Sequence, residues 1–147
     1  SAGELSDKSS SELRSMLSTT NDLERIGDIY FEISKAIEKK SETKLWFDQK
    51  QRDNLNDLMD EVEVAFEQMI KNLNGSYADI DMDQARVMEV AINELRNKVR
   101  KKHLKSMEKK EYNAQSGLVY SNIFSSIERV GDHIINVSEA ASGINLN

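Results

Sequence analysis

The amino-acid sequence predicts an all-α protein, an antiparallel up-down bundle of four long helices with spectrin-repeat-like packing. Proline, which breaks a helix interior at a cost of about 3 kcal/mol, is absent, and glycine occurs only six times. Apolar residues recur every three or four positions over long stretches, as they do on one face of a helix. The breaks between these stretches are short, and short connections make successive helices antiparallel.

Composition narrows the class of protein further. A chain of 147 residues has the size of one domain. Hydrophobic residues make up 38% and charged residues 31%, and no stretch approaches the roughly 18 apolar residues that indicate a membrane span. Cysteine is absent, so disulfides and thiolate metal sites are excluded. The net charge of −6 argues against nucleic acid as a partner, because domains that bind it are usually basic.

The first helix is expected from residue 11 to about residue 40, after a flexible tail of residues 1–10. Ser10 or Ser11 can cap it, since a serine hydroxyl accepts a hydrogen bond from a free amide of the first turn. Its apolar stripe consists of Leu13, Met16, Leu17, Leu23, Ile26, Tyr30, Ile33 and Ile37. The bundle is expected to occupy residues 11–147.

The second helix is expected to follow Asp48, whose side chain suits an N-cap. Its apolar residues are Leu55, Leu58, Met59, Val62, Phe66, Met69, Ile70 and Leu73. Gly75 comes directly after Asn74 and is expected to end the helix in the left-handed conformation that glycine adopts easily.

The third helix is expected to start near Asp81 or Asp83 and to end in a basic run within residues 96–110, whose charges suit the negative end of a helix dipole. One face of this helix carries Ala85, Met88, Ile92, Leu95 and Val99. The fourth helix is expected to be capped by Asn113. It presents Leu118, Ile123, Phe124, Ile127, Val130, Ile134 and Val137.

An internal repeat links the first and fourth helices. Residues 23–28 read Leu-Glu-Arg-Ile-Gly-Asp, and residues 127–132 read Ile-Glu-Arg-Val-Gly-Asp. The match continues in register, with Ile33 and Ser34 against Val137 and Ser138. Chance agreement at two helical sites is a poor explanation, so we treat the element as a repeat.

The repeated element carries paired carboxylates. Glu24 and Asp28 are four residues apart, as are Glu128 and Asp132, so each pair lies on one face of its helix. Both pairs fall on the flank of the apolar stripe, where half-buried carboxylates are costly unless a cation compensates them. Carboxylate oxygens are preferred ligands of hard divalent and trivalent metal ions. The pattern therefore predicts a metal site between helices.

Two further features fit this interpretation. Gly27 and Gly131 each cost about 1 kcal/mol relative to alanine inside a helix, and close helix packing is a reason to keep them. Glu89 and Asn93 repeat the four-residue spacing on the third helix. The alternative is a solvated helix flank, on which neighbouring arginines serve as local counter-charges.

Other metal chemistry is poorly supported. No Glu-x-x-His motif exists, so a ferritin-like di-iron site lacks its imidazole ligands. The only histidines are His103 and His133, and a zinc site of the usual kind is not spelled out. We expect His133 to have a surface or capping role. No phosphate loop or nucleophile motif is present.

The chain resembles the PhoU family in these segments. The string from Asp22 to Asp28 (DLERIGD) and the string from Ser126 to Ala140 (SIERVGDHIINVSEA) are similar to the two signature helices of that family. The pattern between them, from Ala91 through His103, is most similar to the C-terminal cytoplasmic PhoU-like region of bacterial sodium/phosphate cotransporter-family proteins. A family protein has two three-helix repeats. This chain is similar to the signature helix of the first repeat followed by a complete second repeat.

The resemblance implies regulation of phosphate transport, without catalysis, at the inner face of the cell membrane. It implies as partners the membrane domain of a phosphate transporter or transport and signalling proteins, and a homodimer is a further expectation. It also implies metal, iron above all, with manganese, magnesium and zinc left open. Carried over by position, the ligands are Glu24, Asp28, Glu89, Asn93, Glu128 and Asp132.

Two other functions stay open. In a metal-free interaction or dimerisation module, Gly27 and Gly131 would serve helix packing alone. A metal-dependent hydrolase would use water bridged between carboxylates, but the sequence specifies neither a substrate pocket nor a general acid.

Overall fold

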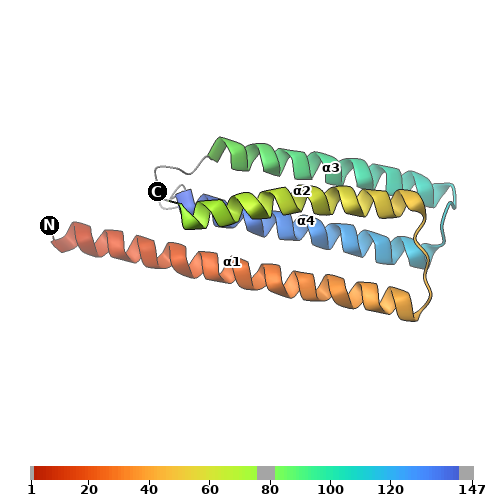
Figure 1. The fold of residues 1–147 in the computed structure, drawn as a ribbon, viewed down its shortest axis with the longest axis horizontal. Helices are drawn as coiled ribbons and strands as arrows, with labels where there is room; N and C mark the ends of the chain where they lie inside the picture. The colour runs from red at the N-terminus through yellow and green to blue at the C-terminus, as the bar shows by residue number, and fades with distance from the viewer. Residues whose placement is uncertain (1, 76–81, 143–147) are drawn as a thin grey trace.

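The structure, a computed structural model, describes residues 2–75 and 82–142. Its elements are four α-helices, and the described residues contain no strand. In chain order these are α1 (Ala2–Glu42), α2 (Gln49–Asn74), α3 (Met82–Glu108) and α4 (Ala114–Ser142), drawn in Figure 1. The predicted all-α class and the number of helices are confirmed, and successive helices run antiparallel (Figure 1).

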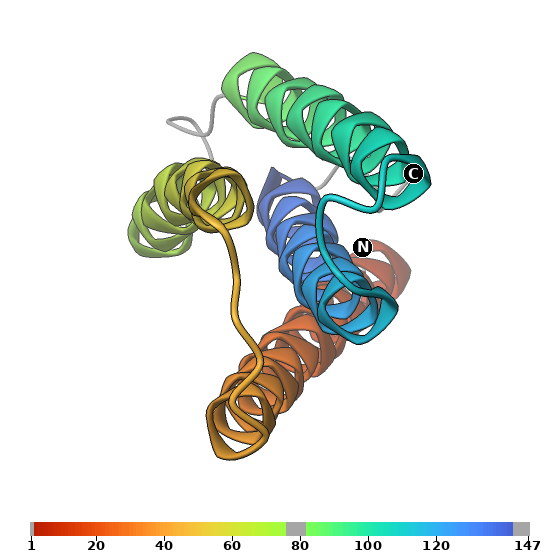
Figure 2. The ribbon, with the colours of Figure 1, turned by 90° about the vertical axis from the view of Figure 1, so that its right-hand side faces the viewer.

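The central element of the bundle is α4. Figure 2, which looks along the helices, shows α4 between α1 on one side and the pair α2 and α3 on the other. The close contacts agree: α1, α2 and α3 each pack against α4, and α2 and α3 pack against each other. Because α1 packs chiefly on α4, only one of its sides is covered.

The start of α1 differs from the expectation. The helix begins at Ala2, so the expected flexible tail is helical from that residue on. It also extends beyond the ends of the other helices (Figure 1). A hydrogen bond ties α1 to α4 at Ser15, whose hydroxyl donates to the backbone oxygen of Ala140 at 3.0 Å. A formed helix lengthens without a new nucleation cost, and no proline interrupts this segment.

Two predicted N-caps are confirmed. The side chain of Asp48 accepts a hydrogen bond from the Gln51 amide at 2.8 Å, and the Gln51 side chain accepts one from the Asp48 amide at 2.9 Å. This reciprocal pair is a capping box. At α4 the side chain of Asn113 accepts a hydrogen bond from the Ser116 amide at 2.7 Å.

The C-terminal ends were predicted less well. Gly75 follows α2 with an extended backbone, φ −89° and ψ 172°, so the prediction of a left-handed cap was wrong. The left-handed positions are Lys44 after α1 and Lys110 after α3, at φ 56° and 55°. Each is followed by an amide that donates to an oxygen five residues back, Leu45 to Lys40 and Glu111 to Ser106. These are Schellman ends with lysine in place of glycine.

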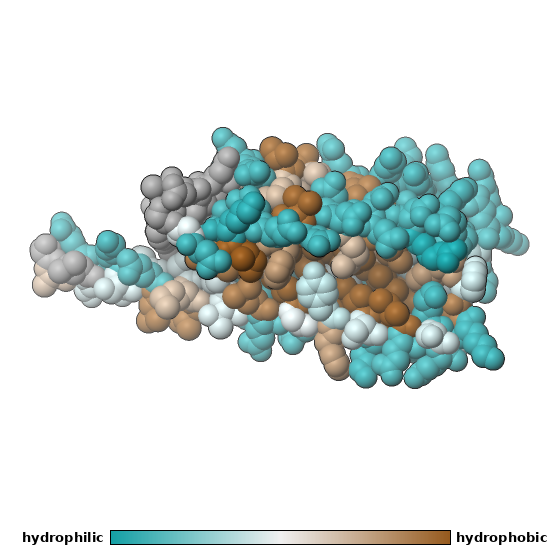
Figure 3. All heavy atoms as spheres, in the orientation of Figure 1, coloured by the Kyte–Doolittle hydropathy of each residue, from teal (hydrophilic) through white to brown (hydrophobic). Residues whose placement is uncertain are grey.

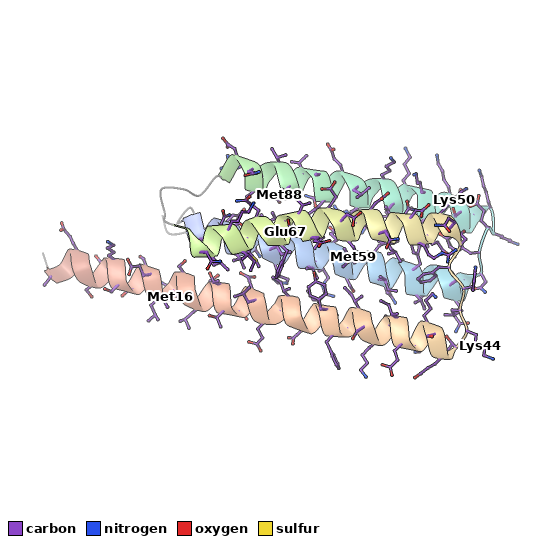
Figure 4. The ribbon with its side chains drawn as sticks, viewed as in Figure 1. Met16, Lys44, Lys50, Met59, Glu67 and Met88 are labelled. Atoms are coloured by element: carbon purple, nitrogen blue, oxygen red, sulfur yellow. The ribbon has the colours of Figure 1, made fainter. Side chains whose placement is uncertain are left out.

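The core lies around α4. Its largest fully buried side chains include Tyr120, Phe124, Ile127 and Ile134 of α4 and Met69 of α2. Four of the five apolar residues expected on the third helix are buried, and Leu95 is partly so. Figure 4 places Met88 on the side of α3 that faces α2.

The expected stripe of the first helix is mostly exposed, which corrects the sequence prediction. The face of α1 toward α4 consists of Asp22, Ile26, Ile29 and Ile33, all of which are buried. By contrast, Leu13, Met16, Leu17, Leu23, Tyr30 and Ile37 are exposed. Figure 3 shows apolar residues on part of α1 and in the region between α1 and α2, where α4 lies behind. The reason is geometric, because a single neighbouring helix covers only a narrow stripe.

Among the described residues, no helix combines the length and the apolar character that crossing a membrane requires.

Candidate functional site

Gly131 permits a close approach between α3 and α4. It is buried, and a Cβ atom added there would lie 3.2 Å from Cδ1 of Ile92 and 3.7 Å from Cγ2 of Val62. Ile92 belongs to α3 and Val62 to α2, so the glycine meets both partner helices. The close contact brings the acidic flank of α4 beside the acidic flank of α3.

The carboxylate of Glu128 is paired at this seam. Glu128 is only 8% exposed, and Arg96 of α3 donates from Nη1 to its Oε1. The Nε atom of Arg96 is buried and has no hydrogen-bond partner among the residues that the structure describes. An uncompensated buried carboxylate would be strongly destabilising, so the guanidinium supplies the charge that Glu128 requires.

Asp132 lies one helical turn further along α4, where the charges of Glu128 and Arg96 also act on it. The residue lies at the exposed edge of this group; partial burial raises the pKa of Asp132, and the carboxylates of Glu128 and Glu89 raise that pKa further. The positive charges of Arg96 and His133 act in the opposite direction. The ion pair of Arg96 with Glu128 and the charges that act on Asp132 group Glu89, Arg96, Glu128 and Asp132 in one cluster, which we call the α3–α4 acidic seam. Asn93 of α3 is partly exposed beside Ile92.

The two carboxylates of the first repeat are placed differently. Glu24 and Asp28 are both exposed on α1, and neither contributes to the pKa shift of Asp132. A Cβ atom added to Gly27 would meet no atom within 4 Å. Within this chain, close helix packing therefore occurs at Gly131 and not at Gly27, because α1 turns this part of the repeat away from α4.

The arrangement does not fit the metal centre that the family resemblance implies. No group of three or more histidine, aspartate or glutamate side chains in the described part of the chain is arranged to hold a metal ion. At the seam a guanidinium already pairs with Glu128, and Asn93 supplies an amide where a second carboxylate would bind more tightly. The six expected ligands are therefore divided between an ion-paired seam and an exposed surface.

Asp22 and His133 form a buried connection that sequence reasoning missed. Nδ1 of His133 lies 2.8 Å from Oδ1 of Asp22, and the side-chain amide of Asn136 donates to the same oxygen at 3.5 Å. Asp22 is 7% exposed. It lies four residues before Ile26 on the buried stripe of α1, and this spacing was the signal available in the sequence.

A second polar site lies at the end of the bundle where α1 connects to α2 and α3 connects to α4 (Figure 1). A pocket of about 520 Å³ is lined by residues from the start of α2, the end of α3, the connection from α3 to α4, and α4, among them Gln51, Asn54, His103, Tyr112 and Tyr120. Figure 4 marks this end by Lys44 and Lys50, which flank the connection from α1 to α2. Burial raises the pKa of Tyr112 to about 12, and burial lowers the pKa of His103.

A model of the PhoU domain matches residues 51–141, which covers nearly all of α2, α3 and α4. A curated protein of Thermotoga maritima, phosphate-specific transport system accessory protein PhoU homolog 1, is 29% identical over 127 residues. The alignment covers 84% of this chain and 52% of that protein, so the chain spans about half of the relative's length. No solved structure matches the chain significantly.

Proposed function

The chain belongs to the PhoU domain family, and on this premise we propose that it is a non-enzymatic regulatory domain of phosphate transport. The observation that carries the proposal is the family match over residues 51–141, which includes the central signature helix. The relative in Thermotoga maritima is an accessory protein of a phosphate-specific transport system by its name. An accessory role of the same kind is what we propose here.

The proposed partner is the membrane domain of a phosphate transporter, of the sodium/phosphate cotransporter type or of another type, at the inner face of the membrane. A partner needs a surface, and α1 supplies one. Leu13, Met16, Leu17, Phe31 and Ile37 are all more than half exposed on this helix. Contiguous exposed apolar patches on a protein surface often mark interaction sites. Figure 4 shows Met16 on the N-terminal part of α1, near the point where α1 extends past the ends of the other helices.

The regulatory role is tested by phosphate uptake in cells. The gene that encodes the chain would be deleted in its own host, and uptake of radiolabelled phosphate would be measured at high and at low external phosphate. We expect the deletion to raise uptake at high phosphate, because a restraint on the transporter is lost. A copy that encodes the complete natural protein should restore the original rate.

The docking surface is tested by complementing the deletion with a copy that carries Leu17→Glu. A copy that carries Ser18→Glu is the matched control. Both positions are exposed on α1 and both changes add one negative charge, but only the first removes an exposed apolar side chain. Restoration by Ser18→Glu and not by Leu17→Glu would support α1 as the docking surface. Uptake that does not change on deletion would refute the regulatory role.

A second candidate function is a metal-free interaction module that assembles through its own helices. The exposed apolar residues of α1 favour it, and this candidate requires no transporter as partner. The occupant of the α1 surface would then be a second copy of the chain.

A further inference from the structure

We infer that Arg96 supplies the cation of the α3–α4 acidic seam, so that in this chain a guanidinium holds the position that a metal ion would hold. The family resemblance implies six metal ligands, but the described residues divide these side chains between an ion-paired seam and an exposed surface. The inference does not depend on the proposed role in phosphate transport, because its test measures metal binding.

The charge balance of the seam requires a cation. The carboxylates of Glu89 and Glu128 both act on Asp132 through space, and Glu128 is almost completely buried. Like charges at this spacing repel, and burial strengthens the repulsion by lowering the effective dielectric constant. Arg96 belongs to the same cluster and is the group that lowers the pKa of Asp132 most strongly.

The geometry makes Arg96 a built-in part of the seam. Its side chain is only 22% exposed, and that of Glu128 only 11%, so the pair is not a solvated surface ion pair of the kind that contributes little. Close packing at Gly131 holds α3 against α4. Arginine presents five N–H donors in a rigid plane, which suits a position between carboxylates from two helix turns.

A metal ion and this guanidinium exclude each other. Two cations that share the same carboxylate repel each other, and the repulsion is strong where water is largely excluded. A metal ion at Glu128 would therefore need Arg96 to move away, which would leave a largely buried guanidinium without its partner. Neither Glu24 nor Asp28 lies at the seam to offset that cost, since both are exposed on α1.

The test compares metal binding by the whole chain and by a variant without this charge. Bound metal would first be removed from wild type and from Arg96→Gln with a chelator. Each protein would then be incubated with Fe²⁺ in the absence of oxygen, or with Mn²⁺, Mg²⁺ or Zn²⁺, and desalted. Elemental mass spectrometry would measure the metal content of each chain. Thermal unfolding would be followed with and without metal. Arg100→Gln is the matched control, because Arg100 lies one turn further along α3 and is exposed.

We expect wild type and Arg100→Gln to retain substoichiometric metal and to show no metal-dependent shift of the unfolding temperature. Arg96→Gln should bind one of these ions at least about tenfold more tightly, a difference of 1.4 kcal/mol. Adding Asp132→Asn to that variant should remove the gain.

Two results would overturn the inference. The first is stoichiometric metal in the wild type that is lost in Glu128→Gln, and this measurement needs no Arg96 variant to fold. The second is an Arg96→Gln chain that folds, as circular dichroism shows, and binds metal no better than wild type does.

Discussion

His103 lies in a basic run of the sequence, but in the structure its ring packs among aromatic side chains. Its ring stacks on Tyr112 with the planes 12° apart, and it meets the rings of Tyr120 and Phe124 edge-on. Nδ1 lies 2.6 Å from the hydroxyl oxygen of Tyr112. Burial raises the pKa of Tyr112 to about 12, so this hydroxyl keeps its proton at neutral pH and can donate it to a neutral imidazole.

His103 is therefore expected to make stability depend on pH. Burial holds the pKa of His103 in the folded chain below its ordinary value of 6.5, so the unfolded chain binds more protons at mildly acidic pH. The free energy of unfolding then rises with pH across this range. Equivalently, stability is lost as the pH falls through the unfolded value toward the lower folded value. Urea unfolding between about pH 7.5 and about pH 5 would measure the slope.

The control for that slope is His103→Gln, which keeps a polar side chain and does not titrate. Its unfolding free energy should fall less with decreasing pH than that of wild type, because every other titratable group is common to both chains. Equal slopes for the two chains would contradict the role of His103.

At the scale of the element, one sequence motif occurs in two different environments. The motif in α4 lies at the centre of the bundle, where Gly131 meets Ile92 and Val62. The motif in α1 has the same spacing, but Gly27 meets no neighbouring atom within 4 Å. The sequence repeat thus predicts equal roles for two glycines that the packing makes unequal.

The two glycines are expected to respond oppositely to substitution. Gly27→Ala should raise the free energy of unfolding by about 0.5–1 kcal/mol, because alanine favours a helix interior and has room here. Gly131→Leu should lower it by about 1–3 kcal/mol, because the side chain would overpack the contact between α3 and α4. Urea unfolding of the two variants, each the control of the other, measures both effects. A destabilised Gly27→Ala chain would indicate that a partner packs on Gly27.

At the scale of the whole molecule, the open side of α1 is the most distinctive feature. Met16 is 67% and Phe31 63% exposed, whereas the equivalent side of α4 is covered by α2 and α3 (Figure 2). An apolar helix face without a neighbour loses the stabilisation that burial would give it, about 25 cal/mol per Å² of apolar surface. A second copy of the chain can recover that free energy.

The second candidate function, a module that assembles through its own helices, predicts that the chain associates through this surface. Sedimentation velocity over a range of concentrations should show a dimer for wild type, and Phe31→Glu should raise the dissociation constant at least about tenfold, which corresponds to 1.4 kcal/mol. The matched control is Ser18→Glu, which adds the same single negative charge at another exposed position of α1. A wild-type chain that remains monomeric at every concentration would contradict the prediction.

Much of the fold was predictable because helices depend on nearby residues. The caps at Asp48 and Asn113 connect groups three residues apart, and an apolar period is visible in any short window. The same locality explains the error at the start of α1, where a polar segment continues a helix that has already formed. It also explains why the acidic pairs of the two repeats were found, since each is defined by a spacing of four residues.

The sequence by itself determined how many helices form, nearly where they lie, and which of their positions carry acidic side chains. Only the tertiary structure decided that Arg96 meets Glu128, 32 residues away, and that His133 meets Asp22, 111 residues away. It also decided which side of α1 is covered. The physical reason is that helical hydrogen bonds and caps act over a few residues, whereas burial and the pairing of charges depend on which helices pack together.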